Sequence, residues 1–211
     1  MKLDYVFIDL DGTLLEGKFK QYNCYKDILL KDGGNPLNLN DYWNMKRSKI
    51  RRDSILAASD YKGDYHNFYL QWIENIEKIK YLKFDTLMED TPRVLTDWKN
   101  LSRKIVLVTM RNNRENLLWQ LHELKLLDIF DEVINCKGLE NPSKDRFIKH
   151  LKFDFAVVIG DTEEDTDLAK SINMKSIAIT SGIRKKELLE ADFYAEDISS
   201  IDLEGIINKK L

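Results

Sequence analysis

Two aspartates at the end of an apolar run are the residues of this sequence best suited to chemistry. Asp9 and Asp11 follow the run Val6-Phe7-Ile8 and precede Gly12 and Thr13. Side chains alternate along an extended strand, so residues two apart point to the same side. Two carboxylates this close repel each other, and a divalent cation such as Mg2+ would remove that repulsion. A carboxylate can also act as a nucleophile. The alternative is a turn that happens to contain two aspartates.

A second acidic group follows another apolar run far along the chain. Asp161 ends that run, and the acidic stretch at 162–167 includes Asp165. The positive end of a helix dipole favours acidic residues in the first turn, which accounts for much of this stretch. It accounts poorly for Asp161, because a carboxylate at one strand tip beside another acidic strand tip needs a counter-charge.

Apolar runs of the β type alternate with helical patterns over most of the chain. Asn113 can cap a helix with leucines at 117, 118, 121 and 124, and further helices are expected at 165–172 and 185–190. Strands are expected at 5–9, 104–109, 132–135, 155–160 and 176–180, with a shorter one at 192–195. This alternation predicts an α/β fold, a Rossmann-like parallel sheet with helices on both faces. Ligands of such sheets bind outside the carboxyl ends of the strands, where Asp9, Thr109 and Asp161 should meet.

The stretch from 16 to 89 interrupts the alternation. It lacks convincing strands, is rich in aromatic residues, and carries Phe68, Trp72, Ile76 and Ile79 at helical spacing. We therefore expect a small helical domain at 16–89, with most aromatic residues in its core. The α/β core would comprise residues 1–15 and 90–211, and the linkers near 15–18 and 88–92 would act as hinges.

Composition narrows the class of protein. The 211 residues include 33 basic and 36 acidic ones, and a net charge of −3 argues against a dedicated nucleic-acid binder. Two cysteines, Cys24 and Cys136, are too few for a disulfide framework and favour a reducing cytosol. The expected first strand begins near Met1, so no signal peptide is expected. No apolar run approaches the roughly 18 residues of a membrane span. We expect a cytoplasmic protein without a membrane partner, and its oligomeric state stays open.

In their order, these motifs resemble those of the haloacid dehalogenase (HAD) superfamily, which consists mostly of phosphoryl-transfer enzymes. Residues 9–13 (Asp-Leu-Asp-Gly-Thr) match the first motif, and Thr109 at the end of an apolar run matches the second. Lys144 matches the third, and Gly160-Asp161 with Asp165 matches the fourth. The first and fourth are specific signals, whereas the other two gain meaning from their position. The stretch at 160–182 is especially similar to phosphoglycolate-phosphatase-type members, and the helical stretch matches the cap that follows the first motif in cap-bearing members.

Two positions depart from the usual pattern of this superfamily. Many members place the third-motif lysine directly before proline, whereas here Pro142 precedes Lys144, so Lys137 is an alternative. After the second-motif residue, members often carry Asn or Ser where this chain has Met110 and Arg111. Arg111 is a candidate for binding substrate phosphate, and the alternative is a solvated loop residue.

The resemblance implies a Mg2+-dependent phosphatase that acts on a small phosphorylated metabolite. Asp9 would be the nucleophile and Asp11 the general acid and base. The implied metal ligands are Asp9, Asp161 and the backbone carbonyl of Asp11, with Asp165 supporting the metal or orienting Lys144. The implied contacts to substrate phosphate come from Thr109, Met110, Arg111 and Lys144, through side chains or backbone amides.

Two other functions are compatible with the same residues. Sugar-phosphate phosphomutases of this superfamily keep both aspartates and the same type of cap, and a catalytically idle binding protein could keep the fold. Haloacid dehalogenation is disfavoured, because those enzymes generally lack an acid at the position of Asp11 and use no metal.

A basic segment in the helical stretch is a candidate substrate contact. Five of the seven residues from Lys46 to Arg52 are cationic. On one continuous helix, Arg47 and Arg51 would share a face, since positions four apart are neighbours. That face could bind the distal part of an anionic substrate, and the alternative is an ordinary solvated helix face.

Overall fold

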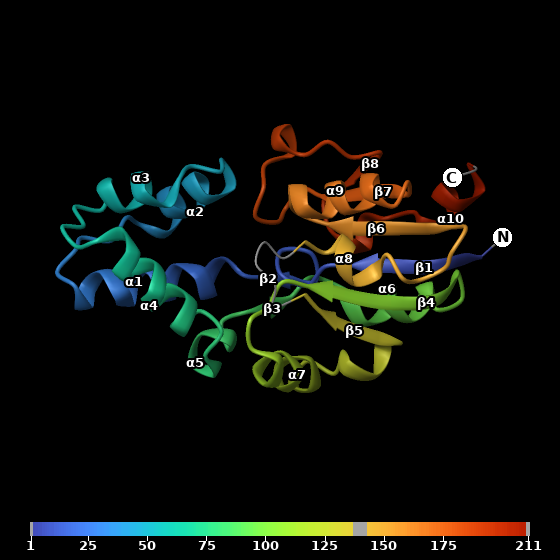
Figure 1. Cartoon of the computed structure of the whole chain (residues 1–211), viewed down its shortest axis with the longest axis horizontal. Coiled ribbons are helices and arrows are strands. Elements are labelled where there is room, and N and C mark those ends of the chain that lie inside the picture. The colour runs from blue at the N-terminus through green and yellow to red at the C-terminus, as the bar shows by residue number, and fades with distance from the viewer. Residues whose placement is uncertain (1, 137–142, 210–211) are drawn as a thin grey trace. The chain divides into compact units, whose positions relative to one another are not determined.

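The computed structural model describes residues 2–136 and 143–209, and it divides the chain into two compact units (Figure 1). The α/β unit consists of Met1–Leu15 and Leu87–Leu211, and the helical unit of Glu16–Thr86. Two short strands connect the units along the chain, β2 (Leu15–Glu16) and β3 (Thr86–Leu87). These two strands pair with each other in a two-stranded sheet. The helical unit therefore ends before residue 89, where the sequence pattern had suggested its boundary.

A six-stranded sheet forms the centre of the α/β unit. Its strand order is β5-β4-β1-β6-β7-β8, and every described pairing is parallel. The strands are β1 (Leu3–Ile8), β4 (Ser102–Thr109), β5 (Glu132–Asn135), β6 (Ala156–Gly160), β7 (Lys175–Ile179) and β8 (Phe193–Ala195). These confirm the predicted strands, and they confirm the Rossmann-like α/β fold. The central strands are continuous apolar runs because both of their faces are buried.

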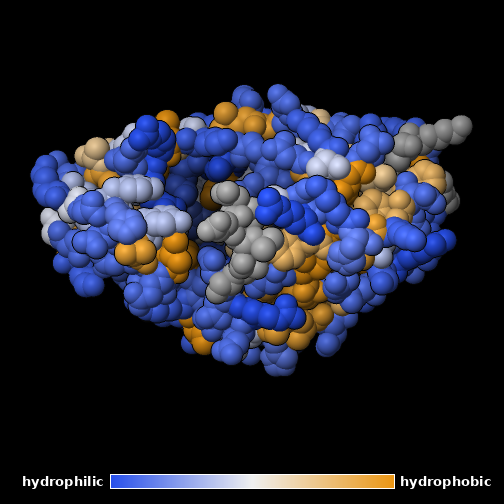
Figure 2. All heavy atoms as spheres, viewed as in Figure 1, coloured by the Kyte–Doolittle hydropathy of each residue, from blue (hydrophilic) through white to orange (hydrophobic). Residues whose placement is uncertain are grey.

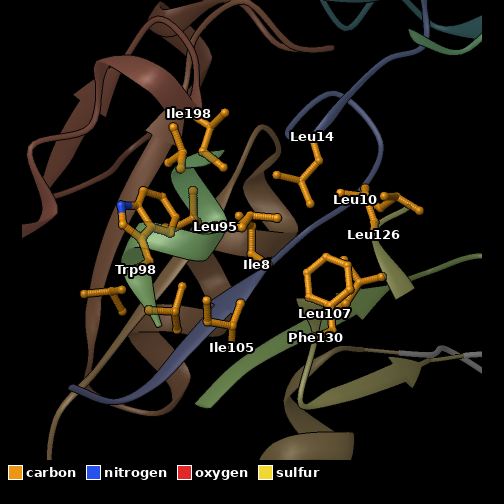
Figure 3. Packing of buried hydrophobic residues seen from close by; sticks show 14 of the residues in the cluster. Ile8, Leu10, Leu14, Leu95, Trp98, Ile105, Leu107, Leu126, Phe130 and Ile198 are labelled. Carbon is orange, nitrogen blue, oxygen red and sulfur yellow. The ribbon is translucent and has the colours of Figure 1, made fainter. Parts of the chain in front are cut away.

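Helices cover the two faces of this sheet. One face packs against α6 (Thr91–Trp98), α7 (Arg114–Glu123) and α10 (Leu203–Asn208), and the other against α8 (Asp145–Ile148) and α9 (Glu163–Ser171). Figure 3 shows Leu95 and Trp98 of α6 beside Ile8, Ile105 and Ile198 on the first face. Each fully buried aliphatic side chain of this kind contributes about 1.5–3 kcal/mol. The packing holds the central strands, and hence their carboxyl ends, in fixed register.

That register brings the predicted chemical groups to one edge of the sheet. Ile8 pairs with Leu107 of β4 on one side and with Ile159 of β6 on the other. Asp9, Thr109 and Asp161 therefore lie within one or two residues of the same level at neighbouring strand ends. The sequence pattern had predicted this convergence.

The helical unit has a hydrophobic core of its own. Its helices are α1 (Lys18–Lys31), α2 (Leu39–Arg47), α3 (Arg52–Ala57), α4 (Tyr65–Asn75) and α5 (Ile79–Leu82). Tyr42, Phe68 and Trp72 are buried in that core, as expected for most of the aromatic residues. Tyr65 and Tyr69 are exceptions, since 45% and 39% of their surface is exposed.

Two helix predictions are wrong. The segment at 185–190 forms only a single 3₁₀ turn, Lys186–Leu188. The basic segment does not form one helix, because α2 ends at Arg47 and α3 begins at Arg52. Between them Lys49 adopts a left-handed backbone with φ of 56°, and the amide of Ile50 donates to the carbonyl of Met45. This helix ending usually uses Gly or Asn, and the sequence has neither there.

Hydrophilic residues cover much of the visible surface, interrupted by groups of hydrophobic residues (Figure 2). None of the helices within the described residues combines the length and apolar character needed to cross a bilayer.

Candidate active site

The first motif supplies a buried carboxylate at the end of β1. Asp9 follows the strand directly, and its amide donates to the carbonyl of Ile159. Only 8% of its surface is exposed. Lys144, which directly precedes α8, places Nζ 2.5 Å from Asp9 Oδ1 and 2.6 Å from Asp165 Oδ1. The third-motif lysine therefore joins the carboxylates of the first and fourth motifs.

Asp165 is held in place by the helix start on which it lies. Its Oδ2 accepts hydrogen bonds from the amide and the hydroxyl of Thr162, at 3.1 and 2.8 Å, as in a capping box. Its other oxygen contacts Lys144. The acidic helix start that the dipole favours thus also fixes the second carboxylate partner of Lys144.

Asp161 is fully buried in a cradle formed by glycine residues. Its Oδ2 accepts a hydrogen bond from the amide of Ile183 at 2.6 Å, and Thr13 Oγ1 lies 3.4 Å from Oδ1. A Cβ atom on Gly12 would lie 1.9 Å from Asp161 Oδ2, and one on Gly182 would lie 2.3 Å from the same atom. Gly12 also has φ of +83°. Side chains at these two positions would displace the carboxylate.

Among the described residues of this cluster, the carboxylates are buried and outnumber the ammonium groups, and both features raise carboxyl pKa values. One oxygen each from Asp9, Asp161 and Asp165 lie within 4.8 Å of one another. Burial raises the pKa of Asp9 to about 7, and the charge of Asp165 adds to this although Lys144 opposes it. Burial and the charge of Asp9 hold the pKa of Asp161 well above its usual range. Burial disfavours the charge of Lys144, but Asp165 and Asp9 outweigh it and raise the pKa of Lys144.

The donor set fits a hard divalent cation. Oxygen ligands from carboxylates are the ones that Mg2+ prefers, and it commonly takes only a few of them from the protein. Asp9, Asp161 and Asp165 are such donors, and a dication would offset the repulsion that raises the pKa values of Asp9 and Asp161. The side chain of Asp11, a fourth predicted metal residue, is not among these three donors, and its predicted contribution was through the backbone carbonyl.

Asp11 has a different partner from Asp9. Its two carboxylate oxygens accept hydrogen bonds from Arg111 Nε at 2.5 Å and Nη2 at 2.7 Å. Arg111 lies just beyond β4 with only 5% of its surface exposed, and Nη2 also donates to Gln120 Oε1 at 3.1 Å. Arg111 is thus a buried ion-pair partner of Asp11 in this structure and not a solvated loop residue.

The other predicted phosphate-binding residues lie at the same sheet edge or next to it. Thr109 ends β4 and is 1% exposed. The side chain of Met110 packs against the apolar cluster under α8 and α9, so only its backbone could face a phosphate. Lys137, the alternative to Lys144, lies outside the described residues.

Arg47 and Arg51 belong to the helical unit. Arg47 ends α2, whereas Arg51 precedes α3, is exposed, and pairs with Asp53. Arg52 is placed differently, with its guanidinium carbon 5.2 Å from the centre of the Trp72 ring and 5.4 Å from that of Tyr69.

Sequence reasoning missed three contributors to the site. Gln120 was overlooked although a polar residue among the buried leucines of α7 is a readable signal. Gly182 and the amide of Ile183 lie in the loop after β7, which was noted only as a likeness to a protein family. Nothing local to that loop indicates that it closes over Asp161, because 22 residues separate Asp161 from Ile183.

Comparison with known proteins adds independent findings. A family model described as "Haloacid dehalogenase-like hydrolase" matches residues 6–179, which is most of the chain. A curated protein named "Putative pyrophosphatase PpaX", from Caldanaerobacter subterraneus subsp. tengcongensis, is 26% identical over 223 residues. That similarity covers 94% of this chain and 92% of the relative.

Two solved structures share the fold over nearly the whole chain. The crystal structure of a predicted phosphatase from Clostridium acetobutylicum has a TM-score of 0.76 at 21% identity and covers 99% of this chain and 100% of its own. That of a predicted phosphoglycolate phosphatase from Haemophilus somnus has a TM-score of 0.76 at 14% identity and covers 98% and 99%.

Proposed function

The chain belongs to the haloacid dehalogenase-like hydrolase family, and on this basis we propose that it is a Mg2+-dependent phosphatase. Its substrate would be a small phosphorylated metabolite, and its reaction would pass through an aspartyl-phosphate on Asp9. The resemblance to proteins named as phosphatases supports this reaction class. A cytoplasmic location is part of the proposal, and it is supported by Cys24 and Cys136, which are both unbridged and buried.

One observation carries the proposal: Asp9 lies in a buried carboxylate cluster that also contains a lysine. Lys144 fixes one oxygen of Asp9 at 2.5 Å, which orients the carboxylate. Asp161 and Asp165 complete a set of oxygen donors that would hold Mg2+ together with Asp9. When bound, Mg2+ would neutralise charge on the phosphoryl group and on the carboxylates. Lys144 and a bound Mg2+ would place two positively charged groups beside Asp9, and such groups favour the binding of an anionic substrate.

In the proposed reaction, each of these residues has a separate role. Asp9 attacks phosphorus, so a bond forms between its carboxylate oxygen and phosphorus while the bond to the leaving oxygen breaks. Asp11, in its protonated form, gives a proton to that oxygen, and the resulting carboxylate later takes one from the water that attacks the aspartyl-phosphate. This second attack breaks the bond to Asp9 and releases phosphate. Thr109, the backbone amides near Met110, and Lys144 would hold the phosphoryl oxygens.

The test is phosphate release from a panel that contains an aryl phosphate and phosphorylated metabolites, with Mg2+ and with EDTA. We expect turnover only with Mg2+, and Asp9→Asn should lower it by at least about a thousandfold. Turnover that persists in EDTA or in Asp9→Asn would contradict the proposal. Conversion of a sugar phosphate to its isomer without release of phosphate would identify a phosphomutase, and inactivity on the whole panel would favour a binding protein.

A further inference from the structure

We propose that Arg111, held by Gln120, is a positioning residue that fixes the carboxyl group of Asp11 at the sheet edge, and that it does not bind substrate phosphate. This inference rests on the proposed function, because it assigns a role within the same reaction. It replaces the expectation that Arg111 would contact the substrate.

Two parts of the chain that are distant in sequence meet at this point, since Arg111 and Gln120 are nine residues apart whereas Asp11 lies 100 residues before Arg111. Asp11 lies in the loop after β1, Arg111 follows β4, and Gln120 lies on α7. Arg111 lies 100 residues further along the chain than Asp11. Its Nε donates to Asp11 Oδ2 at 2.5 Å, and its Nη2 donates to Oδ1 at 2.7 Å. Because the guanidinium is a rigid planar fork, this bidentate contact fixes both the position and the plane of the carboxylate.

Gln120 in turn restrains the fork. Its Oε1 accepts from Arg111 Nη2 at 3.1 Å, and only 2% of its surface is exposed. The other buried residues of α7 are Leu117 and Leu121, so Gln120 is a polar exception on an apolar face. A polar side chain buried on an apolar face lowers the stability of the fold unless it is hydrogen-bonded. The hydrogen bond to Arg111 provides this compensation for Gln120.

Asp11 needs such a support more than Asp9 does. The side chain of Asp11 is 32% exposed, whereas that of Asp9 is 10% exposed and packed beside Lys144. A partly exposed carboxylate on a loop can occupy several rotamers. A misplacement of about 1 Å in a catalytic group can cost roughly a hundredfold in rate, so holding one rotamer favours catalysis.

The same geometry argues against a phosphate contact from Arg111. A phosphate would be bound best by two adjacent N–H groups of the fork, whereas Asp11 occupies the edge formed by Nε and Nη2, and Nη2 also donates to Gln120 Oε1. The side chain of Arg111 is also only 5% exposed. Lys144 remains the cation that directly adjoins Asp9.

The experiment measures kcat, KM and inhibition by inorganic phosphate for Arg111→Met, Asp11→Asn and the double variant, using an aryl phosphate with Mg2+. Arg111→Met should lower kcat by about 10- to 100-fold, less than the roughly 10²- to 10⁴-fold that general acid–base catalysis can supply. KM and phosphate inhibition should stay unchanged. In the Asp11→Asn background, the loss of Arg111 should have no further effect, because Arg111 acts through Asp11.

Milder variants and a control complete the test. Gln120→Met should lower kcat in the same way by about fivefold, as expected from the loss of one hydrogen bond. Arg111→Lys keeps the charge without the fork and should be partly active. If Arg111→Met does not fold, Gln120→Met and Arg111→Lys still test the proposal. Arg114→Met removes an exposed arginine at the start of the same helix and should behave as the wild type.

Two results would overturn the inference. If Arg111→Met raises KM and weakens phosphate inhibition while kcat is kept, Arg111 binds phosphate. If the fold-decrease in kcat of the double variant equals the product of the fold-decreases of the two single variants, Arg111 acts independently of Asp11. An inactive wild-type protein would contradict the proposed function instead, so the two failures are distinguishable.

Discussion

Buried charges occur in both units of this protein, but they are arranged differently. In the helical unit Lys20 Nζ lies 2.8 Å from Asp85 Oδ2, and the pair ties α1 to the segment before β3. In the described part of the α/β unit, the ammonium of Lys144 contacts the carboxylates of Asp9 and Asp165, and Asp161 lies in the same group of three carboxylates. The first arrangement joins opposite charges and suits a structural role. Among the described residues, the second leaves an excess of carboxylates that the fold alone does not require, and this excess supports the proposal that a cation binds there.

The largest expected effect on stability comes from the structural pair. Asp85→Asn removes the negative charge 2.8 Å from the buried ammonium of Lys20 and should lower the free energy of unfolding by about 3 kcal/mol. Urea titrations of the wild type and the variant measure this. Replacing both residues, as Lys20→Met with Asp85→Leu, should restore most of the loss. If Asp85→Asn is as stable as the wild type, the pair does not stabilise the helical unit.

The opposite effect is expected in the carboxylate cluster. Asp161→Asn removes a carboxyl group whose charged form is disfavoured by burial and by the charge of Asp9. It keeps an oxygen that can accept from the amide of Ile183, so the metal-free protein should gain about 1 kcal/mol in free energy of unfolding. The same change should abolish the stabilisation that Mg2+ gives the wild type, together with activity. Thermal melts with Mg2+ and with EDTA test this. If the metal-free Asp161→Asn variant is less stable than the metal-free wild type, the carboxylate cluster does not destabilise the α/β unit, and the contrast with the Lys20–Asp85 pair is wrong.

The pH dependence of the metal-free protein should report the same excess charge. The pKa of Asp9 is raised from 3.8 to about 7, so between these values the folded protein binds a proton that the unfolded chain does not. This contribution to stability is present at low pH and is lost as the pH rises toward about 7. Denaturation in EDTA should therefore give a smaller free energy of unfolding at about pH 7.5 than at about pH 5. Asp9→Asn should flatten this difference, and an unchanged slope in that variant would assign it to other groups.

The smallest effect is expected from the basic segment of the helical unit. We propose that Arg47 and Arg51 contact the distal part of the substrate, although they lie at the end of one helix and before the next. Arg47→Ala and Arg51→Ala should then raise KM for the true substrate by roughly fivefold or less, because exposed ion pairs contribute at most about 1 kcal/mol. Hydrolysis of a small aryl phosphate should be spared. Lys83→Ala, at an exposed lysine of the same unit, is the control. Equal kinetics for the true substrate in all variants would leave the segment as ordinary surface.

Most of the α/β architecture follows from the sequence alone. Strands that are buried on both faces are continuous apolar runs, and these runs end at Asp9, Thr109 and Asp161. In a parallel sheet such ends meet at one edge, so the grouping of these residues could be predicted without a structure. The helix after β4 was equally readable, because the side chain of Asn113 accepts from the amide of Asn116 as a helix cap should.

The partners of these groups were decided by the tertiary structure. Arg111 reaches Asp11 across 100 residues, and Lys144 reaches Asp9 across 135, and no periodic pattern records which long side chain meets which carboxylate. The break in the basic segment has a similar cause, since Lys49 adopts a left-handed backbone without the glycine that would announce it. Local sequence determines strands, helices and the edge where they end. Contacts between distant segments depend on how the whole sheet and its helices pack, and so only the folded chain determines which of the charges become neighbours.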